Sequence, residues 1–160
     1  ADSGVPARLR IAGTGPLHAA IAQRIARLGL GDSIELSGQL SRDGLAELFA
    51  ASDLFLAPTQ LESFGIAALE ARAAGLPVLG MRQSGVRDFL TDGDDSLLAD
   101  DDGGFTDALL RFASEDGLQT RLAAGARLPL TGYSWEDLIA ACGDSYRRAV
   151  AMRIVPAAAR

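Results

Sequence analysis

The sequence contains no lysine, one cysteine and one histidine, and these shortages exclude several classes of function. All 15 basic residues are arginines and the net charge is −6, which argues against nucleic acid or an anionic membrane surface as partner. The single cysteine, Cys142, allows no internal disulfide, as is usual in a reducing compartment. No His/Cys cluster is available for a metal ion. No run of 18 apolar residues is present, so the sequence predicts a cytoplasmic protein with no integral membrane segment.

The chain has enough apolar residues for a core and alternates strands with helices. Of its 160 residues 48% are hydrophobic, which suits one domain, predicted over residues 1–154 with a tail at 155–160. Strands are expected at 8–13, 33–38, 54–57, from Pro77 and at 96–99, and each is followed by a helix. This order predicts an α/β fold with a doubly wound, Rossmann-like parallel sheet.

The segment at 56–81 organises the rest of the chain. A buried strand leads through a turn into a helix predicted over 63–74, with Ser63 as its N-cap and Gly75 at its C′ position. Gly65 would let a ligand approach the unpaired N–H groups of the first turn, which suits a phosphate. Glu62 lies just before the helix and Glu70 two turns inside it, a separation of about 12 Å at ~1.5 Å per residue. An anionic ligand could therefore have a hydroxyl-bearing group held at each end.

A second glycine turn, GTGP at 13–16, follows the first strand and opens a helix. This arrangement also occurs in NAD-binding Rossmann domains, where Glu35 would be the ribose-binding acid. His18 stands at the third glycine position of that fingerprint, which makes an NAD-dependent dehydrogenase the weaker alternative. His18 itself is expected to face solvent, because no carboxylate or serine partner lies near it in sequence.

Three stretches together resemble a known family. RLRIAGTGP, IELSGQLSRDGLAELFAASDLFLAPTQLESFGIAALEARAAGLPVLG and YSWEDL look like the C-terminal, donor-binding domain of retaining glycosyltransferases of the GT-B fold, the large family 4, or glycosyl transferases group 1. The resemblance runs from about Ala7 to Val150. Its most specific part is the pair Glu62 and Glu70, which encloses Phe64 and Gly65.

The resemblance implies a function and a set of site residues. The domain would bind a nucleoside-diphosphate sugar, such as a UDP- or GDP-sugar, and take part in transferring the sugar to an acceptor hydroxyl. Glu62 would hold hydroxyls of the donor sugar as the catalytic residue, and Glu70 would accept both ribose hydroxyls. No cofactor or metal is implied. The implied substrate-binding residues are Gly13, Gly15, Gly38, Gln39, Leu40, Ser63, Phe64, Gly65, Ile66 and Glu70.

The chain also departs from the family pattern. The family places another strand and helix before RLRIAG, with an arginine and a lysine that grip the diphosphate, and an N-terminal acceptor-binding domain before that. The resemblance therefore implies a fragment that is inactive alone, and a non-catalytic nucleotide-binding module is the second alternative. Arg87 and Asp88 replace the family's usual Pro and Glu, and Arg87 is expected to be a surface residue. The full-length enzyme could be membrane-associated.

The missing strand gives a structural expectation. In the order 3-2-1-4-5-6 it would lie between the strands at 8–12 and 53–57, whose facing edges would be left unpaired. Unpaired buried backbone groups cost about 1–3 kcal/mol each. We therefore expect either direct pairing of these two strands, the favoured outcome, or a dimer in which a second copy fills the gap. The sugar, the base and the acceptor are not specified by the sequence.

Overall fold

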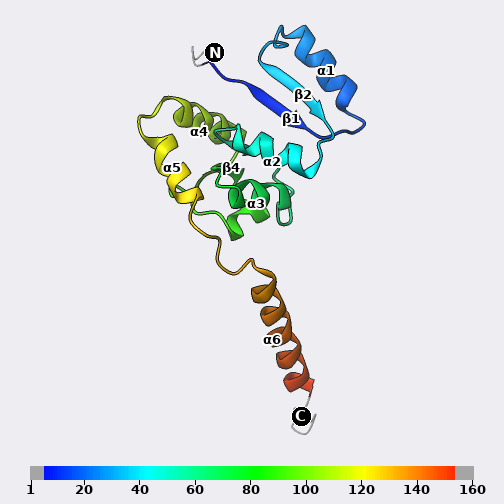
Figure 1. Ribbon diagram of the computed structural model, residues 1–160, viewed down its shortest axis with the longest axis vertical. Coiled ribbons are helices and arrows are strands. Elements are labelled where there is room, and N and C mark those ends of the chain that lie inside the picture. The colour runs from blue at the N-terminus through cyan, green and yellow to red at the C-terminus, as the bar shows by residue number, and fades with distance from the viewer. Residues whose placement is uncertain (1–5, 154–160) are drawn as a thin grey trace. The chain divides into compact units, whose positions relative to one another are not determined.

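The computed structural model describes residues 6–153. Its contacts divide the chain into two compact units, residues 1–128 and 129–160, and this boundary falls inside the predicted domain 1–154. Figure 1 labels the elements in chain order. They are β1 (Leu9–Ala12), α1 (His18–Arg27), β2 (Ile34–Gly38), α2 (Arg42–Ala50), β3 (Phe55–Ala57), α3 (Ile66–Ala73), β4 (Val78–Met81), the 3₁₀ helix η1 (Gly85–Asp88), β5 (Ser96–Ala99), α4 (Asp102–Ser114), α5 (Leu118–Ala126) and α6 (Trp135–Arg153).

The five predicted strands are all present and all pair in parallel, which confirms the α/β class. They form two sheets, a two-stranded one in the order β1-β2 and a three-stranded one in the order β3-β4-β5. Each crossover between consecutive strands of a sheet contains a helix, as parallel pairing requires. All four residues of β4 are buried, so both faces of the three-stranded sheet are covered.

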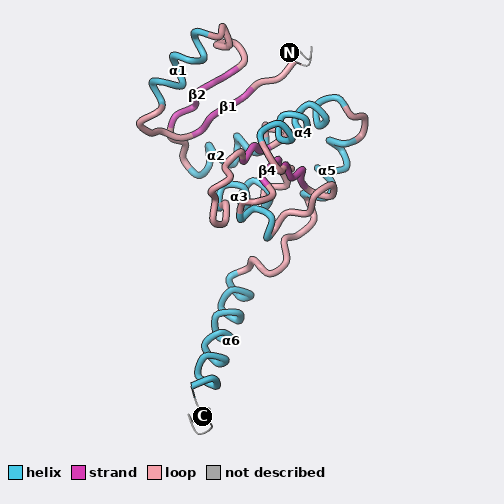
Figure 2. Tube along the Cα trace, turned by 180° about the vertical axis from the view of Figure 1, so that it is seen from behind, coloured by secondary structure: helices cyan, strands magenta, loops and turns pink. Residues whose placement is uncertain are grey.

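The core lies on the three-stranded sheet. Leu56, Leu79 and Leu97 occupy paired positions on β3, β4 and β5, so their side chains share one face. Leu79 and Leu97 belong to a buried cluster with Phe112 of α4 and with Leu118 and Leu122 of α5. Figures 1 and 2 show α4 and α5 beside this sheet. Because α4 and α5 supply most of this cluster, they stabilise the sheet in which β4 is central.

Helix α3 connects β3 to β4 and ends as the sequence predicts. Gly75 has a φ of 84°, the left-handed conformation expected at C′. Its N–H donates to the Arg72 carbonyl and the N–H of Leu76 donates to the Ala71 carbonyl, both at 3.0 Å. These two bonds form a Schellman motif that satisfies carbonyls at the helix end. Pro77 follows and directly precedes β4.

The favoured expectation about the incomplete sheet is wrong. Within the described residues, β1 pairs only with β2 and β3 pairs only with β4, so Leu9 and Ile11 form no ladder with Leu54–Leu56. The observed groups β1-β2 and β3-β4-β5 are the two parts of a doubly wound sheet on either side of its centre. Pairing with a second copy stays a prediction.

The second unit, residues 129–160, contains α6. Ser134 and Asp137 form a capping pair at its start: Ser134 Oγ accepts from the N–H of Asp137 at 3.1 Å and donates to its carboxylate at 2.8 Å. Apolar side chains along α6 are exposed, including Trp135, Ile139 and Tyr146. Among residues 6–153, no helix is long and apolar enough to cross a membrane.

Candidate functional site

The loop between β3 and α3 carries Glu62 and packs on the segment that follows β4. The N–H of Gly85 donates to the Glu62 carbonyl at 2.8 Å. A Cβ at Gly85 would lie 2.1 Å from the Ser63 carbonyl oxygen, so only glycine allows this approach. Both segments leave the carboxyl ends of their strands, where ligands bind in doubly wound sheets. The fold therefore places the predicted phosphate loop at the expected edge.

Gly65, and not Ser63, caps helix α3. The helix begins at Ile66, with Gly65 as N-cap at φ 89° and with no side-chain capping bond. The predicted Ser63 cap is therefore wrong, because Glu62, Ser63 and Phe64 form the non-helical turn that precedes the helix. The same turn invalidates the 12 Å separation of Glu62 and Glu70, which assumed a helix between them. A start without a side-chain cap leaves the first N–H groups to solvent or to a ligand.

Gly65 is confined by its surroundings as well as by its φ. A Cβ there would lie 2.7 Å from Cγ1 of Val86, and a Cβ on Gly80 of β4 would lie 2.8 Å from Cγ2 of the same side chain. The buried Val86 side chain thus fits between two glycines and holds the start of α3 against β4. Sequence analysis missed Val86; its signal was the pair of small residues Ser84 and Gly85 shortly after a buried strand.

Both candidate glutamates are exposed. The Glu62 carboxylate accepts a hydrogen bond from the N–H of Phe64 at 3.3 Å, so it already lies at the entrance to α3. Glu70 is two residues before Arg72, which is buried at 4% exposure, and positions two apart on a helix are about 200° apart around its axis. Glu70 is therefore on the solvent side of α3, where a ligand can reach it.

A second group of predicted residues gathers at the carboxyl ends of β1 and β2. The N–H of Gly13 donates to the Gly38 carbonyl at 2.6 Å, and both glycines have positive φ, 127° and 65°. Gln39 is exposed and Leu40 half-buried directly after β2. No Cβ contact lies within 4 Å of Gly13, Gly15 or Gly38, so the turn leaves room for a ligand beside the backbone.

The residues of the dehydrogenase alternative do not form its site. Glu35 is the second residue of β2 and pairs with Arg10 of β1, Nε to Oε2 at 3.5 Å. Three further residues at about 3.3 Å each separate it from the carboxyl end, where a ribose-binding acid would have to be. His18, the first residue of α1, is exposed as predicted. Arg87 is exposed too, with Asp88 at 3.9 Å.

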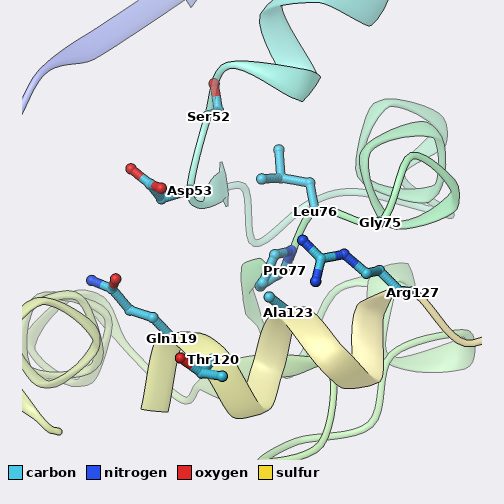
Figure 3. Close-up of a pocket in the computed structure, with 9 residues that line it drawn as sticks. All are labelled: Ser52, Asp53, Gly75, Leu76, Pro77, Gln119, Thr120, Ala123 and Arg127. Atoms are coloured by element: carbon cyan, nitrogen blue, oxygen red, sulfur yellow. The ribbon is translucent and has the colours of Figure 1, made fainter. Parts of the chain in front are cut away.

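The pocket in Figure 3 lies elsewhere. It has a volume of about 290 Å³ and is lined by Asp53 before β3, by Pro77 before β4 and by Gln119 and Arg127 at α5. These are the amino ends of the strands, away from the predicted site. A larger hollow of about 610 Å³ beside β5 and α4 is rich in aspartates and so does not suit a phosphate. Among residues 6–153, no group of three or more metal-binding side chains occurs.

Comparison with known proteins identifies the family. Residues 1–128 match the glycosyl transferases group 1 family. The chain belongs to this family.

Individual related proteins resemble this chain over only part of their own length. A D-inositol 3-phosphate glycosyltransferase of Xylanimonas cellulosilytica is 34% identical over 127 residues, which are 78% of this chain and 30% of that protein. Sucrose-phosphate synthase of Thermosynechococcus elongatus matches with a TM-score of 0.76 at 24% identity, over 94% of this chain and 40% of that one. HepE of Anabaena, solved with UDP-glucose, matches with a TM-score of 0.66 at 22% identity, over 78% of this chain and 36% of that one.

Membership in the glycosyl transferases group 1 family supports the fold and the class of protein predicted from sequence. The chain spans about 30% of the length of the curated relative described above. The structural matches at these identities concern the fold alone.

Proposed function

We propose that this chain is the donor-binding part of a retaining glycosyltransferase that moves a hexosyl group from a nucleoside-diphosphate sugar to an acceptor hydroxyl. The observation that carries this proposal is the start of α3. Gly65 caps the helix without a side chain, and the Glu62 carboxylate lies on the preceding amide. A diphosphate at the N–H groups of Phe64 to Ile66 would displace the Glu62 carboxylate from the N–H of Phe64 and leave it beside the sugar end of the donor.

Glu70 would bind the other end of the donor. An ionised carboxylate accepts several O–H bonds at once, and such bonds are about twice as strong as those between neutral groups. Glu70 is exposed on the helix that would receive the diphosphate, so the ribose hydroxyls are its natural partners. Backbone groups of Gly13, Gly15 and Gly38 to Leu40 would lie against the nucleotide.

The chemical contribution of this domain would be electrostatic. Sugar transfer with retention passes through an oxocarbenium-like state while negative charge grows on the departing diphosphate. Oriented N–H groups at the start of α3 would stabilise that charge. Glu62 would hold the donor sugar in place. The proposal includes no metal ion and no cofactor.

The other parts of the proposal concern the whole protein. The curated relative is about two and a half times as long as this chain, so an acceptor domain and further diphosphate-binding groups are expected from the rest of the protein. We propose UDP as the first nucleotide to test, because HepE was solved with UDP-glucose. A cytoplasmic location belongs to the same proposal.

Nucleotide binding tests the site directly. The chain is titrated with UDP, GDP and ADP up to millimolar concentration by NMR, and the Kd is measured for the unchanged chain and for Glu70→Ala. We expect Glu70→Ala to raise the Kd at least about tenfold, because the charged hydrogen bonds it removes are worth about 1.5–3 kcal/mol. Glu47→Ala, an exposed glutamate on α2, is the matched control and should leave the Kd unchanged.

Three results would contradict the proposal. These are no binding of any of the three nucleotides, an equal effect of Glu47→Ala, and chemical-shift changes confined to the pocket at Asp53 and Arg127. Nucleotide binding by the full-length protein without any sugar transfer would instead favour a non-catalytic nucleotide-binding module. Unchanged turnover in Glu62→Ala of the full-length enzyme would overturn the role proposed for Glu62.

A further inference from the structure

Arg72, on the buried side of α3, joins three separate segments of the first unit. Its Nε donates to Asp95 Oδ2 at 2.8 Å, its Nη2 to the Gly125 carbonyl at 3.1 Å and its Nη1 to the Leu128 carbonyl at 3.1 Å. Nη1 also donates to the carbonyl of Ala126. Side-chain exposure is 5% for Arg72 and 8% for Asp95, so the ion pair is closed to solvent, while the bonds to Gly125 and Leu128 are partly buried.

Each partner of Arg72 is itself fixed. The other oxygen of Asp95 accepts from the N–H of Thr91 at 2.8 Å, which ties the turn before β5. The three carbonyls belong to the last turn of α5 and the residues after it, where helix carbonyls run out of partners within the helix; that of Gly125 also accepts from the N–H of Leu128 at 3.0 Å. A Cβ on Gly125 would lie 2.1 Å from the Asp94 carbonyl oxygen, so α5 and the turn at 91–95 are in direct contact. Arg72 therefore fastens α3 to a rigid corner.

We propose that Arg72 is the positioning residue for Glu70. This inference rests on the proposed role of Glu70 in binding the ribose. The two residues lie on one helix about 200° apart, so a side chain that fixes the buried face of α3 also fixes the direction in which Glu70 points. The planar guanidinium, with its donors in a rigid fork, sets the rotation of α3 and its position along its own axis.

Burial alone does not explain this arrangement. A buried ion pair contributes little net stability over apolar side chains of similar volume, because both charges lose their hydration. The ion pair and the carbonyl partners instead fix the orientation of α3, because one side chain forms four hydrogen bonds to two other segments. Within residues 6–153, the Glu70 side chain has no hydrogen bond of its own, so its position depends on the orientation of α3.

A double-mutant cycle on UDP affinity tests the proposal in the full chain. Arg72→Lys keeps the charge but removes the fork, and Asp95→Asn keeps an acceptor for Thr91. Both should raise the Kd about tenfold, the effect of one well-placed hydrogen bond. In the Glu70→Ala background Arg72→Lys should have no further effect, because Arg72 acts through Glu70. Phe112→Leu, in the core at α4, should lower the Tm and leave the Kd unchanged.

The outcomes separate the two proposals. If Glu70→Ala weakens UDP binding but Arg72→Lys and Asp95→Asn lower only the Tm, the positioning role is overturned and the donor site stands. A further loss from Arg72→Lys in the Glu70→Ala background would also overturn it. If Glu70→Ala itself has no effect, the proposed donor site fails. Should Arg72→Lys not fold, Asp95→Asn carries the same test.

Discussion

The two sheets of the first unit have glycine turns at their carboxyl ends but differ in how they are stabilised. In the three-stranded sheet every residue of β4 is buried. In residues 9–38, which contain β1, α1 and β2 and are all described, no residue is buried. Leu17 and Leu28, at the two ends of α1, are 68% and 57% exposed. The first sheet therefore relies on one ladder of hydrogen bonds, and the second on a core.

This difference indicates which half of the candidate site is preformed. Gly65 and Glu62 are held by Val86 and by the segment at 84–86, which belong to the well-packed sheet. Gly13 and Gly38 are held to each other by one backbone bond of 2.6 Å. Local opening costs least where few apolar contacts are buried. We therefore expect the phosphate loop at Glu62–Gly65 to be more rigid than the turn at 13–16.

The largest effect should come from the core of the second sheet. Leu79 is fully buried in the core cluster that it forms with Leu97, Phe112, Leu118 and Leu122. Leu79→Ala should therefore lower the free energy of unfolding by about 2–5 kcal/mol. Ile11→Ala removes a half-buried side chain from β1 and should cost about 1 kcal/mol or less. Urea unfolding followed by circular dichroism measures both, and equal losses would contradict the comparison.

A smaller effect should separate the two glycine turns. Gly65→Ala introduces a Cβ at φ 89°, 2.7 Å from Val86, and should cost about 1–3 kcal/mol. Gly15→Ala meets nothing within 4 Å and should change stability by less than about 0.5 kcal/mol. The same urea titration compares them. If Gly15→Ala were as costly as Gly65→Ala, the first turn would be as tightly held as the second.

Much of the fold could be predicted from the sequence because its signals are local. The alternation of apolar strands with helices predicted five parallel strands, and all five are present. Gly75 likewise ends α3 as expected. The start of α3 was misjudged, because Ser63 has the preferred chemistry of an N-cap, whereas Gly65 is required there by its left-handed φ and by Val86.

The rest of the site depends on contacts between segments that are distant in sequence. The fit of Val86 between Gly65 and Gly80, and the bonds from Arg72 to residues 95, 125, 126 and 128, have no short-range pattern. Arg72 stands at a helix position where an arginine is ordinarily exposed. Only the approach of α5 and the turn at 91–95 to α3 makes it a buried link.

The smallest effect concerns the edges of β1 and β3 that have no partner strand within residues 6–153. These are called the open edges. In β1 the N–H of Leu9 donates to the Ser33 carbonyl of the neighbouring segment at 2.8 Å. Alternate residues of a strand direct their N–H groups to opposite edges, so the N–H of Arg10 points to the open edge. An open edge of this kind can pair with another chain. We expect a weak dimer at high protein concentration.

Two substitutions at Arg10 test this dimer. Arg10→Ala removes the exposed pair with Glu35 and keeps the backbone donor, so it should dimerise like the unchanged chain. Arg10→Pro removes the donor on the open edge alone, a position where an edge strand tolerates proline, and should be monomeric. Analytical ultracentrifugation over a range of concentrations measures both. A chain that stays monomeric throughout would contradict pairing between copies, and equal dimerisation of both variants would place the contact elsewhere than the edge of β1.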